Sequence, residues 1–185
     1  MSQSTGKQSV SGRGLSELVF FGLLAVALGL MMFAGRRSGG QVSVGTPLPE
    51  LMASGWLNTA AIPSRQTLSS KVVVVDCWAS WCPPCRAAMP KLAKLYADYG
   101  PLGVEFIGLT PESTAKRSDV AQFINRTSGF DWPVGYGANP TLDMLNIRGY
   151  PTVIVFNAHG VSTWSSNSLS GIEDALDKAL AMAGE

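Results

Sequence analysis

The sequence predicts an α/β domain, and three stretches carry that prediction. Residues 72–75 are four consecutive valines, a β-branched run that suits a strand buried on both faces of a sheet. The string WCPPC follows at residues 81–85, where a helix can begin, and TVIVF at residues 152–156 has the composition of another strand. The 185 residues suit one such domain plus an appendage.

Cys82 and Cys85 are the candidate catalytic residues. If Cys82 is the N-cap of the following helix, its sulfur faces free N–H groups and the positive end of the helix dipole, which favours the thiolate. A thiol with a lowered pKa is a nucleophile at neutral pH, and Cys85, one turn farther on, is placed to attack the resulting mixed disulfide. Pro83 and Pro84 fall at the first helical positions, where a missing N–H costs little. The pair is therefore predicted to cycle between dithiol and disulfide without a cofactor.

The string WASWCPPCRAAMP, residues 78–90, resembles the thioredoxin superfamily and in particular its membrane-anchored TlpA/ResA/CcmG (DsbE)-like branch. The likeness covers the chain from about Gly45 to the C-terminus and includes GTPLPEL at residues 45–51. It implies a thioredoxin-like fold, with a central mixed sheet flanked by helices and the strand–helix insertion of that branch. It also implies that Pro90 stands where these families kink the active-site helix.

A second string, IRGYPTVIVF at residues 147–156, matches the same superfamily. The resemblance implies a cis bond between Tyr150 and Pro151, packed against the dithiol, with the backbone at Tyr150 free to bind an extended substrate. Trp81 and Tyr150 are expected to shape the substrate groove. The alternative is an ordinary trans proline that opens the strand over residues 152–156.

Two residues depart from the TlpA-like pattern. Asp76, six residues before Cys82, matches the buried acid of thioredoxin itself, whereas Ala88 stands where the branch usually carries Glu. We interpret Asp76 as the proton relay for Cys85, because burial raises the pKa of a carboxylate and lets it exchange protons near neutrality. The alternative is a solvated or capping Asp at the end of a strand.

Alternation along the first strand separates the third cysteine from the redox pair. Asp76 and Trp78 are predicted on one face of the sheet, and Cys77 on the other with Val73 and Val75. Cys77 is therefore interpreted as a small buried hydrophobic residue rather than as a third redox partner.

The N-terminal part is predicted to anchor the protein in a membrane. Residues 1–14 are polar and expected to be disordered, 15–35 form a transmembrane signal anchor, 36–44 a linker and 45–185 the thioredoxin-like domain. A cleaved signal peptide is the alternative, but the A-x-A pattern at residues 25–27 lies inside the apolar run. Positive charges flank the run on both sides, so the orientation follows from the resemblance, which implies a cytoplasmic N-terminus and a redox domain outside.

The remaining elements follow from hydrophobic spacing and turn residues. The sequence predicts an irregular strand or hairpin in 56–70 leading into the first core strand, the active-site helix over 83–99, a strand at 104–109, a helix over 119–126, a helical turn at 143–146, a hairpin turn at 157–160 and a C-terminal helix from Ile172.

Composition and cysteine count argue against several classes of function. A net charge of +1 without a basic run argues against nucleic acid as a partner. A metal site is disfavoured because one C-x-x-C supplies two ligands, Cys77 is expected to face away, and His159, the sole histidine, is expected in a solvated turn rather than as a catalytic base. The Pro and Thr that precede a single reactive Cys in peroxiredoxins are absent, which disfavours a peroxidase.

The favoured hypothesis is an extracytoplasmic thiol–disulfide oxidoreductase of the cytoplasmic membrane. By resemblance, it would reduce cysteine pairs in exported proteins, such as an apocytochrome c or a copper-site protein, and a membrane-embedded thiol reductant would supply its electrons. Electron transfer in the opposite direction, which would make the protein a disulfide oxidase or isomerase, stays open, because the direction depends on the reduction potential of the cysteine pair. Pro83 and Pro84 favour the reductant, because they remove N–H donors near the thiolate.

Overall fold

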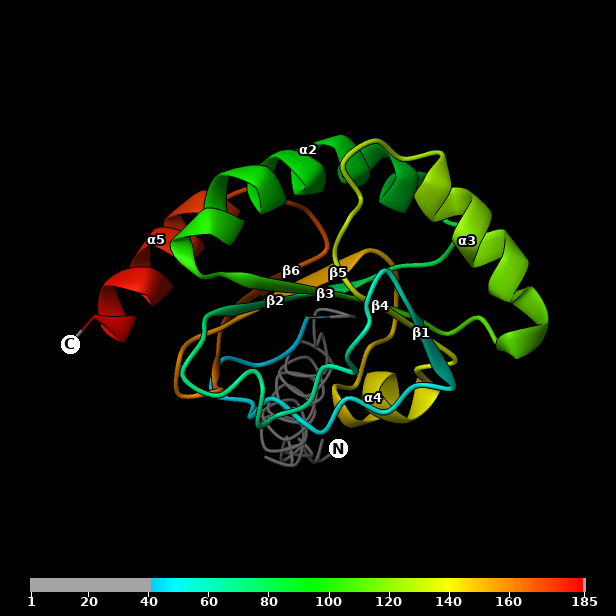
Figure 1. The fold of residues 1–185 in the computed structure, drawn as a ribbon. Helices are drawn as coiled ribbons and strands as arrows, with labels where there is room; N and C mark the ends of the chain where they lie inside the picture. The colour runs from blue at the N-terminus through cyan, green and yellow to red at the C-terminus, as the bar shows by residue number, and fades with distance from the viewer. Residues whose placement is uncertain (1–40, 185) are drawn as a thin grey trace, which may run out of the picture. The chain divides into compact units, whose positions relative to one another are not determined.

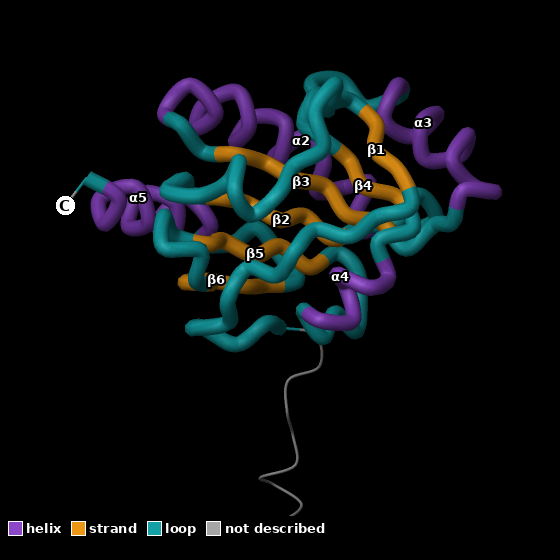
Figure 2. The backbone as a smooth tube through the Cα atoms, turned by 60° about the horizontal axis from the view of Figure 1, so that its bottom comes forward, coloured by secondary structure: helices purple, strands orange, loops and turns teal. Residues whose placement is uncertain are grey.

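In the computed structural model, which describes residues 41–184, a six-stranded mixed sheet forms the centre of the domain (Figure 2). The strand order is β1-β4-β3-β2-β5-β6, with β2, β3 and β4 parallel to one another and β1, β5 and β6 antiparallel to their neighbours. This arrangement confirms the predicted α/β fold with a mixed sheet. The strands are β1 (Gly55–Leu57), β2 (Val73–Cys77), β3 (Glu105–Thr110), β4 (Val134–Tyr136), β5 (Thr152–Phe156) and β6 (Ser162–Ser166).

Helices cover both faces of the sheet. Figure 1 shows α2, α3 and α5 on one face and α4 on the other. The parallel neighbours β2 and β3 are joined through α2, so β2, α2 and β3 form one βαβ unit. The helices are α2 (Pro83–Tyr99), α3 (Arg117–Asn125), α4 (Asn139–Met144) and α5 (Ile172–Ala183), with 3₁₀ turns at Gly100–Leu102 and Thr114–Lys116.

Strand β2 divides the interior into two apolar clusters. Val74 and Trp78 pack with α2 and α5 on one side, whereas Val73, Val75 and Cys77 pack with α4 on the other. All five residues of β2 are buried. The alternation predicted for Cys77 is therefore confirmed, and the continuous valine run is explained by burial on both faces.

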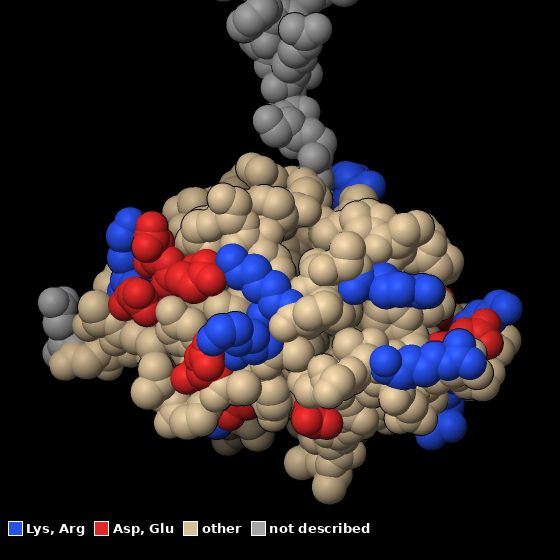
Figure 3. Space-filling view, turned by 90° about the horizontal axis from the view of Figure 1, so that it is seen from above, with Lys and Arg blue, Asp and Glu red and all other residues tan. Residues whose placement is uncertain are grey.

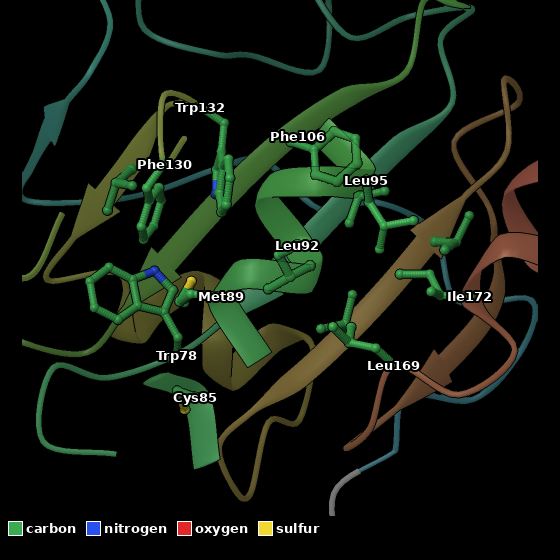
Figure 4. Close-up of a cluster of buried hydrophobic side chains, with 14 of the residues drawn as sticks. Trp78, Cys85, Met89, Leu92, Leu95, Phe106, Phe130, Trp132, Leu169 and Ile172 are labelled. Atoms are coloured by element: carbon green, nitrogen blue, oxygen red, sulfur yellow. The ribbon is translucent and has the colours of Figure 1, made fainter. Parts of the chain in front are cut away.

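The larger cluster lies between the sheet and α2 and combines aromatic rings with aliphatic side chains (Figure 4). The Trp78 ring lies 4.6 Å from the Phe123 ring, and Phe130 stacks on Trp132 at 4.1 Å between centroids. Met89 and Leu92 of α2 are fully buried against this group. The packing fixes α2 over the end of β2, so the helix starts directly beside the strand that carries Asp76.

Most predicted boundaries agree with the structure, and two differ. The active-site helix, the strand at 152–156 and the start of α5 are confirmed. Helix α4 begins at Asn139, four residues before the predicted turn, because Pro140 opens it at a position where proline needs no N–H donor. In the segment 56–70, the predicted strand or hairpin is only the short strand β1, which pairs with β4 at the far edge of the sheet and does not lead directly into β2.

The predicted disordered tail, signal anchor and most of the linker, residues 1–40, lie outside the described residues. Within residues 41–184, no helix has the length and apolar character needed to cross a membrane.

Gly108 provides a test of the central packing. A Cβ at this position in β3 would lie 3.0 Å from the indole nitrogen of Trp78, 3.3 Å from that of Trp132 and 3.1 Å from Val134. We expect Gly108→Ala to lower the free energy of unfolding by about 1–3 kcal/mol, because three rigid neighbours must move. Chemical denaturation of the oxidised full-length protein in neutral detergent measures this change.

Gly100→Ala is the matched control, since an added Cβ at Gly100 finds its nearest neighbour at 3.9 Å and the backbone there is right-handed helical. An equal loss of stability in both variants would contradict the packing explanation.

Candidate active site

Cys82 and Cys85 form a disulfide bond at the start of α2. Cys82 is the N-cap, with φ −91° and ψ 106°, and its sulfur accepts a hydrogen bond of 3.2 Å from the backbone N–H of Cys85. Pro83 and Pro84 occupy the first helical positions, as predicted. The Cys82 sulfur therefore lies at the positive end of a 17-residue helix, where a negative charge on sulfur is stabilised.

An aromatic pair flanks the disulfide. Trp81 is 66% exposed although Cys82 beside it is only 3% exposed. The ring of Trp81 meets that of Tyr150 edge to face, with 6.0 Å between centroids and 80° between planes. Burial, with smaller contributions from Cys77 and Glu112, raises the pKa of Tyr150 to about 12, so the phenol stays neutral. The two predicted groove residues thus come together beside the disulfide.

The Tyr150–Pro151 bond is cis, as the resemblance implied. The side-chain amide of Asn167 donates to the carbonyl of Pro151 at 2.8 Å and to the hydroxyl of Thr152 at 2.9 Å, which ties this loop to the end of β6. A mainly apolar hollow of about 320 Å³ joins Pro151 to Pro84 and Ala88 of α2. Ala88 contributes a methyl group to this hollow, at the position where the TlpA-like branch usually has a carboxylate.

Pro90 lies inside α2, five residues after Cys85, where it removes one helical N–H donor. The helix nevertheless continues to Tyr99.

Asp76 is the fourth residue of β2 and is 1% exposed. Neither carboxylate oxygen has a hydrogen-bond partner among the described residues. Burial raises the pKa of Asp76 from 3.8 to about 7. Its place on β2 puts it on the face that α2 covers, with Val74 and Trp78. The alternative of a solvated Asp is therefore wrong, while a role as proton relay stays a prediction.

Glu112 is a buried acid near the site that the sequence interpretation missed. Its carboxylate accepts hydrogen bonds from the backbone N–H of Ser80 at 2.8 Å, from the Ser80 hydroxyl and from the Thr110 hydroxyl. Ser80 lies two residues before Cys82, so Glu112 holds the loop between β2 and α2. The position of Glu112 just after β3 was a usable signal, because the carboxyl ends of the parallel strands β2 and β3 meet at one edge.

Cys77 and His159 lie away from the disulfide. Cys77 is buried in the opposite cluster, and burial raises the pKa of its thiol well above 9.0. His159 is exposed in the turn after β5, at the end of that strand farther from Pro151. Neither side chain lies at the site of the Cys82–Cys85 disulfide.

These features define a thioredoxin-like protein. A disulfide lies at the N-cap of the helix that follows the central strand β2, and a cis-proline directly precedes β5, the antiparallel neighbour of β2. The model of the Redoxin family matches residues 43–178. The chain belongs to the Redoxin family.

Two curated relatives are similar to this chain over its redox region. The thiol–disulfide oxidoreductase ResA of Halalkalibacterium halodurans is 38% identical over 98 residues, which cover 50% of this chain and 52% of the relative. ResA of Oceanobacillus iheyensis is 34% identical over 94 residues, covering 50% and 47%. The chain thus spans about half the length of these relatives. The resemblance to the TlpA/ResA/CcmG-like branch is confirmed.

Solved structures share the fold. A thiol–disulfide isomerase of Corynebacterium glutamicum superposes with a TM-score of 0.63 at 24% identity, covering 74% of this chain and 97% of its own. A thiol:disulfide interchange protein of Chlorobium tepidum gives 0.62 at 23% identity, covering 75% and 98%. At these identities the likeness supports the thioredoxin-like fold alone.

The burial of Asp76 predicts a pH-dependent stability. The pKa of Asp76 is about 7 in the folded protein and 3.8 in the unfolded chain, so its contribution is fully present below pH 4 and is lost as the pH rises through 7. Between pH 4 and pH 8 the wild type should lose about 4 kcal/mol more free energy of unfolding than Asp76→Asn, because the variant has no carboxyl group to ionise at this position. Denaturant unfolding of the oxidised proteins at both pH values measures this difference.

Asp119→Asn is the control, because the carboxylate of Asp119 is half exposed and paired with Lys116 on the surface. Parallel pH profiles for the wild type and Asp76→Asn would contradict the raised pKa.

The hydrogen bonds of Glu112 to Ser80 predict that loss of this carboxylate loosens the loop around Ser80. We expect Glu112→Ala to lower the free energy of unfolding by about 1–3 kcal/mol, because it leaves a partly buried N–H without its acceptor. Hydrogen exchange measured by NMR should show a loss of protection at the Ser80 amide. Glu50→Ala, which removes an exposed carboxylate, is the control. Unchanged protection at Ser80 in the Glu112 variant would show that the carboxylate does not hold this loop.

Proposed function

We propose that this protein is a thiol–disulfide oxidoreductase that reduces disulfides in exported proteins. The observation that carries the proposal is the position of Cys82: its sulfur caps α2, accepts an N–H hydrogen bond and stands beside a second cysteine with which it forms a disulfide. The names of the curated relatives support the same activity. The redox pair itself stores the two electrons, so no cofactor is required.

The reaction proceeds by two thiol–disulfide exchanges. In the reduced protein, the Cys82 thiolate attacks one sulfur of the client disulfide, a bond forms between Cys82 and the client, and the other client sulfur leaves and takes a proton. Cys85 then loses its proton and its sulfur attacks Cys82, which releases the second client thiolate to be protonated. Two electrons and two protons pass to the client, and the Cys82–Cys85 disulfide remains.

Asp76 is proposed to accept the proton of Cys85 in the second step. A carboxylate with a pKa of about 7 accepts a proton at neutral pH and returns it as readily. Asp76 and Cys85 lie on the same side of the sheet, the side covered by α2. Ala88 offers no acid in the hollow between α2 and Pro151. The carboxylate of Glu112 is occupied by Ser80 and Thr110, whereas neither oxygen of Asp76 has a partner among the described residues.

Recognition of the client is proposed for Trp81, Tyr150 and Pro151, the residues beside the disulfide. An extended client segment would lie against this surface with its disulfide at Cys82.

The N-terminal sequence and the family support a proposal for the cellular setting. Residues 15–35 are proposed to anchor the chain in the cytoplasmic membrane with residues 45–185 on the outer side, where clients such as an apocytochrome c acquire disulfides. A membrane-embedded thiol reductant would reduce the Cys82–Cys85 disulfide after each turnover.

Client reduction tests the assigned cysteines. The reduced full-length protein should reduce a disulfide-bonded peptide, Cys82→Ser should lose this activity, and Cys85→Ser should accumulate a mixed disulfide that mass spectrometry detects. Cys77→Ala is the matched control and should retain activity, because Cys77 lies in the opposite cluster. Full activity in Cys82→Ser would refute the proposed nucleophile.

The reduction potential of the Cys82–Cys85 pair decides whether the protein reduces or forms disulfides in its clients. Equilibration with graded dithiothreitol buffers, read by thiol alkylation, should give a value near that of thioredoxin, about −270 mV. A value of about −120 to −180 mV would assign the protein to disulfide formation or isomerisation instead.

A further inference from the structure

A basic groove lies beside the disulfide, between the first turns of α2 and the helix α3. Ser80, Arg86, Phe123 and Arg126 line this hollow of about 320 Å³. Arg86 also borders a second, more apolar hollow of about 360 Å³ that contains Trp81. The basic groove therefore continues directly into the aromatic surface next to Cys82.

The arginines of the basic groove are not neutralised within the described residues. All four ion pairs there use lysines, and neither Arg86 nor Arg126 takes part in one. Asp119, which also lines the groove, is paired with Lys116 at 3.1 Å. The groove therefore carries an excess of positive charge on side chains whose planar donors suit carboxylates.

Arg86 is exposed, but its guanidinium group makes two contacts within the domain. Its guanidinium donates to the carbonyl of Ser80 at 3.4 Å and lies 5.6 Å from the centre of the Phe123 ring. Ser80 in turn is held by Glu112. A charge fixed in this way costs less ordering on binding than a free arginine does.

We propose that the basic groove binds an acidic segment of the client protein, with Asp or Glu side chains of the client against Arg86 and Arg126. This inference rests on the proposed function and names the chemistry of its substrate. Ser80 is only two residues from Cys82, and an extended chain advances about 3.3 Å per residue, so a client held at Cys82 reaches the groove within a few residues. The acidic residues would thus flank the client cysteine.

An anionic membrane surface fits the same face less well. Figure 3 looks onto the helices and shows acidic side chains gathered toward the α5 end and basic ones prevailing toward the α3 end. Helix α5 carries three acids, Glu173, Asp174 and Asp177, and one lysine, Lys178, so a negatively charged bilayer would repel its excess of negative charge. A positive charge confined to a groove at one end suits a peptide segment better than a flat surface.

Two disulfide-bonded peptides that differ only in three residues after one cysteine, Glu-Glu-Glu or Gln-Gln-Gln, test the inference. We expect the reduced full-length protein to reduce the Glu peptide about three- to fivefold faster at low salt, and this ratio to fall toward one in 0.5 M NaCl. Arg126→Gln should lower the ratio below about two.

Arg65→Gln is the matched control, because Arg65 is exposed beside His159, at the opposite end of the sheet, and its loss changes the net charge equally. This variant should keep the full ratio. Equal rates for the two peptides, or an equal loss in both variants, would overturn the inference while client reduction itself stands. Failure to reduce either peptide would overturn the proposed function as well. Arg126-dependent binding to phosphatidylglycerol vesicles without a peptide preference would assign the groove to a membrane surface.

Discussion

The capping of α2 by the Cys82 sulfur is the interaction on which the arrangement of the site depends. It requires a helix that starts within a few residues of a fully buried strand, and β2 and α2 meet this requirement because aromatic packing holds the helix against the sheet. The loop between them is short, so it needs its own support. Glu112 supplies that support by accepting the N–H and hydroxyl of Ser80. Strand β2, helix α2 and the segment after β3 therefore fix the position of one sulfur atom.

The proposed proton relay and the proposed client groove use groups in opposite dielectric environments. Asp76 lies inside the domain without a hydrogen-bond partner among residues 41–184, and burial alone brings its pKa near neutrality. Arg86 and Arg126 are exposed, and their charges act through solvent. Salt screens charges at the surface far more than charges in the interior. Changes in ionic strength are therefore expected to alter client capture more than proton transfer.

Local patterns predicted the centre of the site, whereas contacts between distant segments were out of reach. The valine run and WCPPC each carry their structure within a few residues, and the structure agrees with the predicted strand and helix. The cis bond at Tyr150-Pro151 was implied by the family resemblance, and the structure agrees with it. Glu112 became visible only when β3 was placed next to β2. The pairing of β1 with β4 joins residues about 80 apart, which hydrophobic spacing along one segment does not reveal.

The combination of Asp76 and Ala88 constrains how this chain handles protons. An acid in the hollow at position 88 would be reached from the surface beside Pro151, whereas Asp76 is reached only from within the domain, under α2. In the proposed relay, a proton taken up by Asp76 would therefore be held inside the domain, away from solvent. Because Gly108 faces Asp76 on β3 and carries no side chain, β3 adds no charge or hydrogen bond from that position. The pKa of Asp76 is accordingly set by burial, and any substitution that admits water beside it would lower that pKa and weaken the acid's capacity to take the proton of Cys85 at neutral pH.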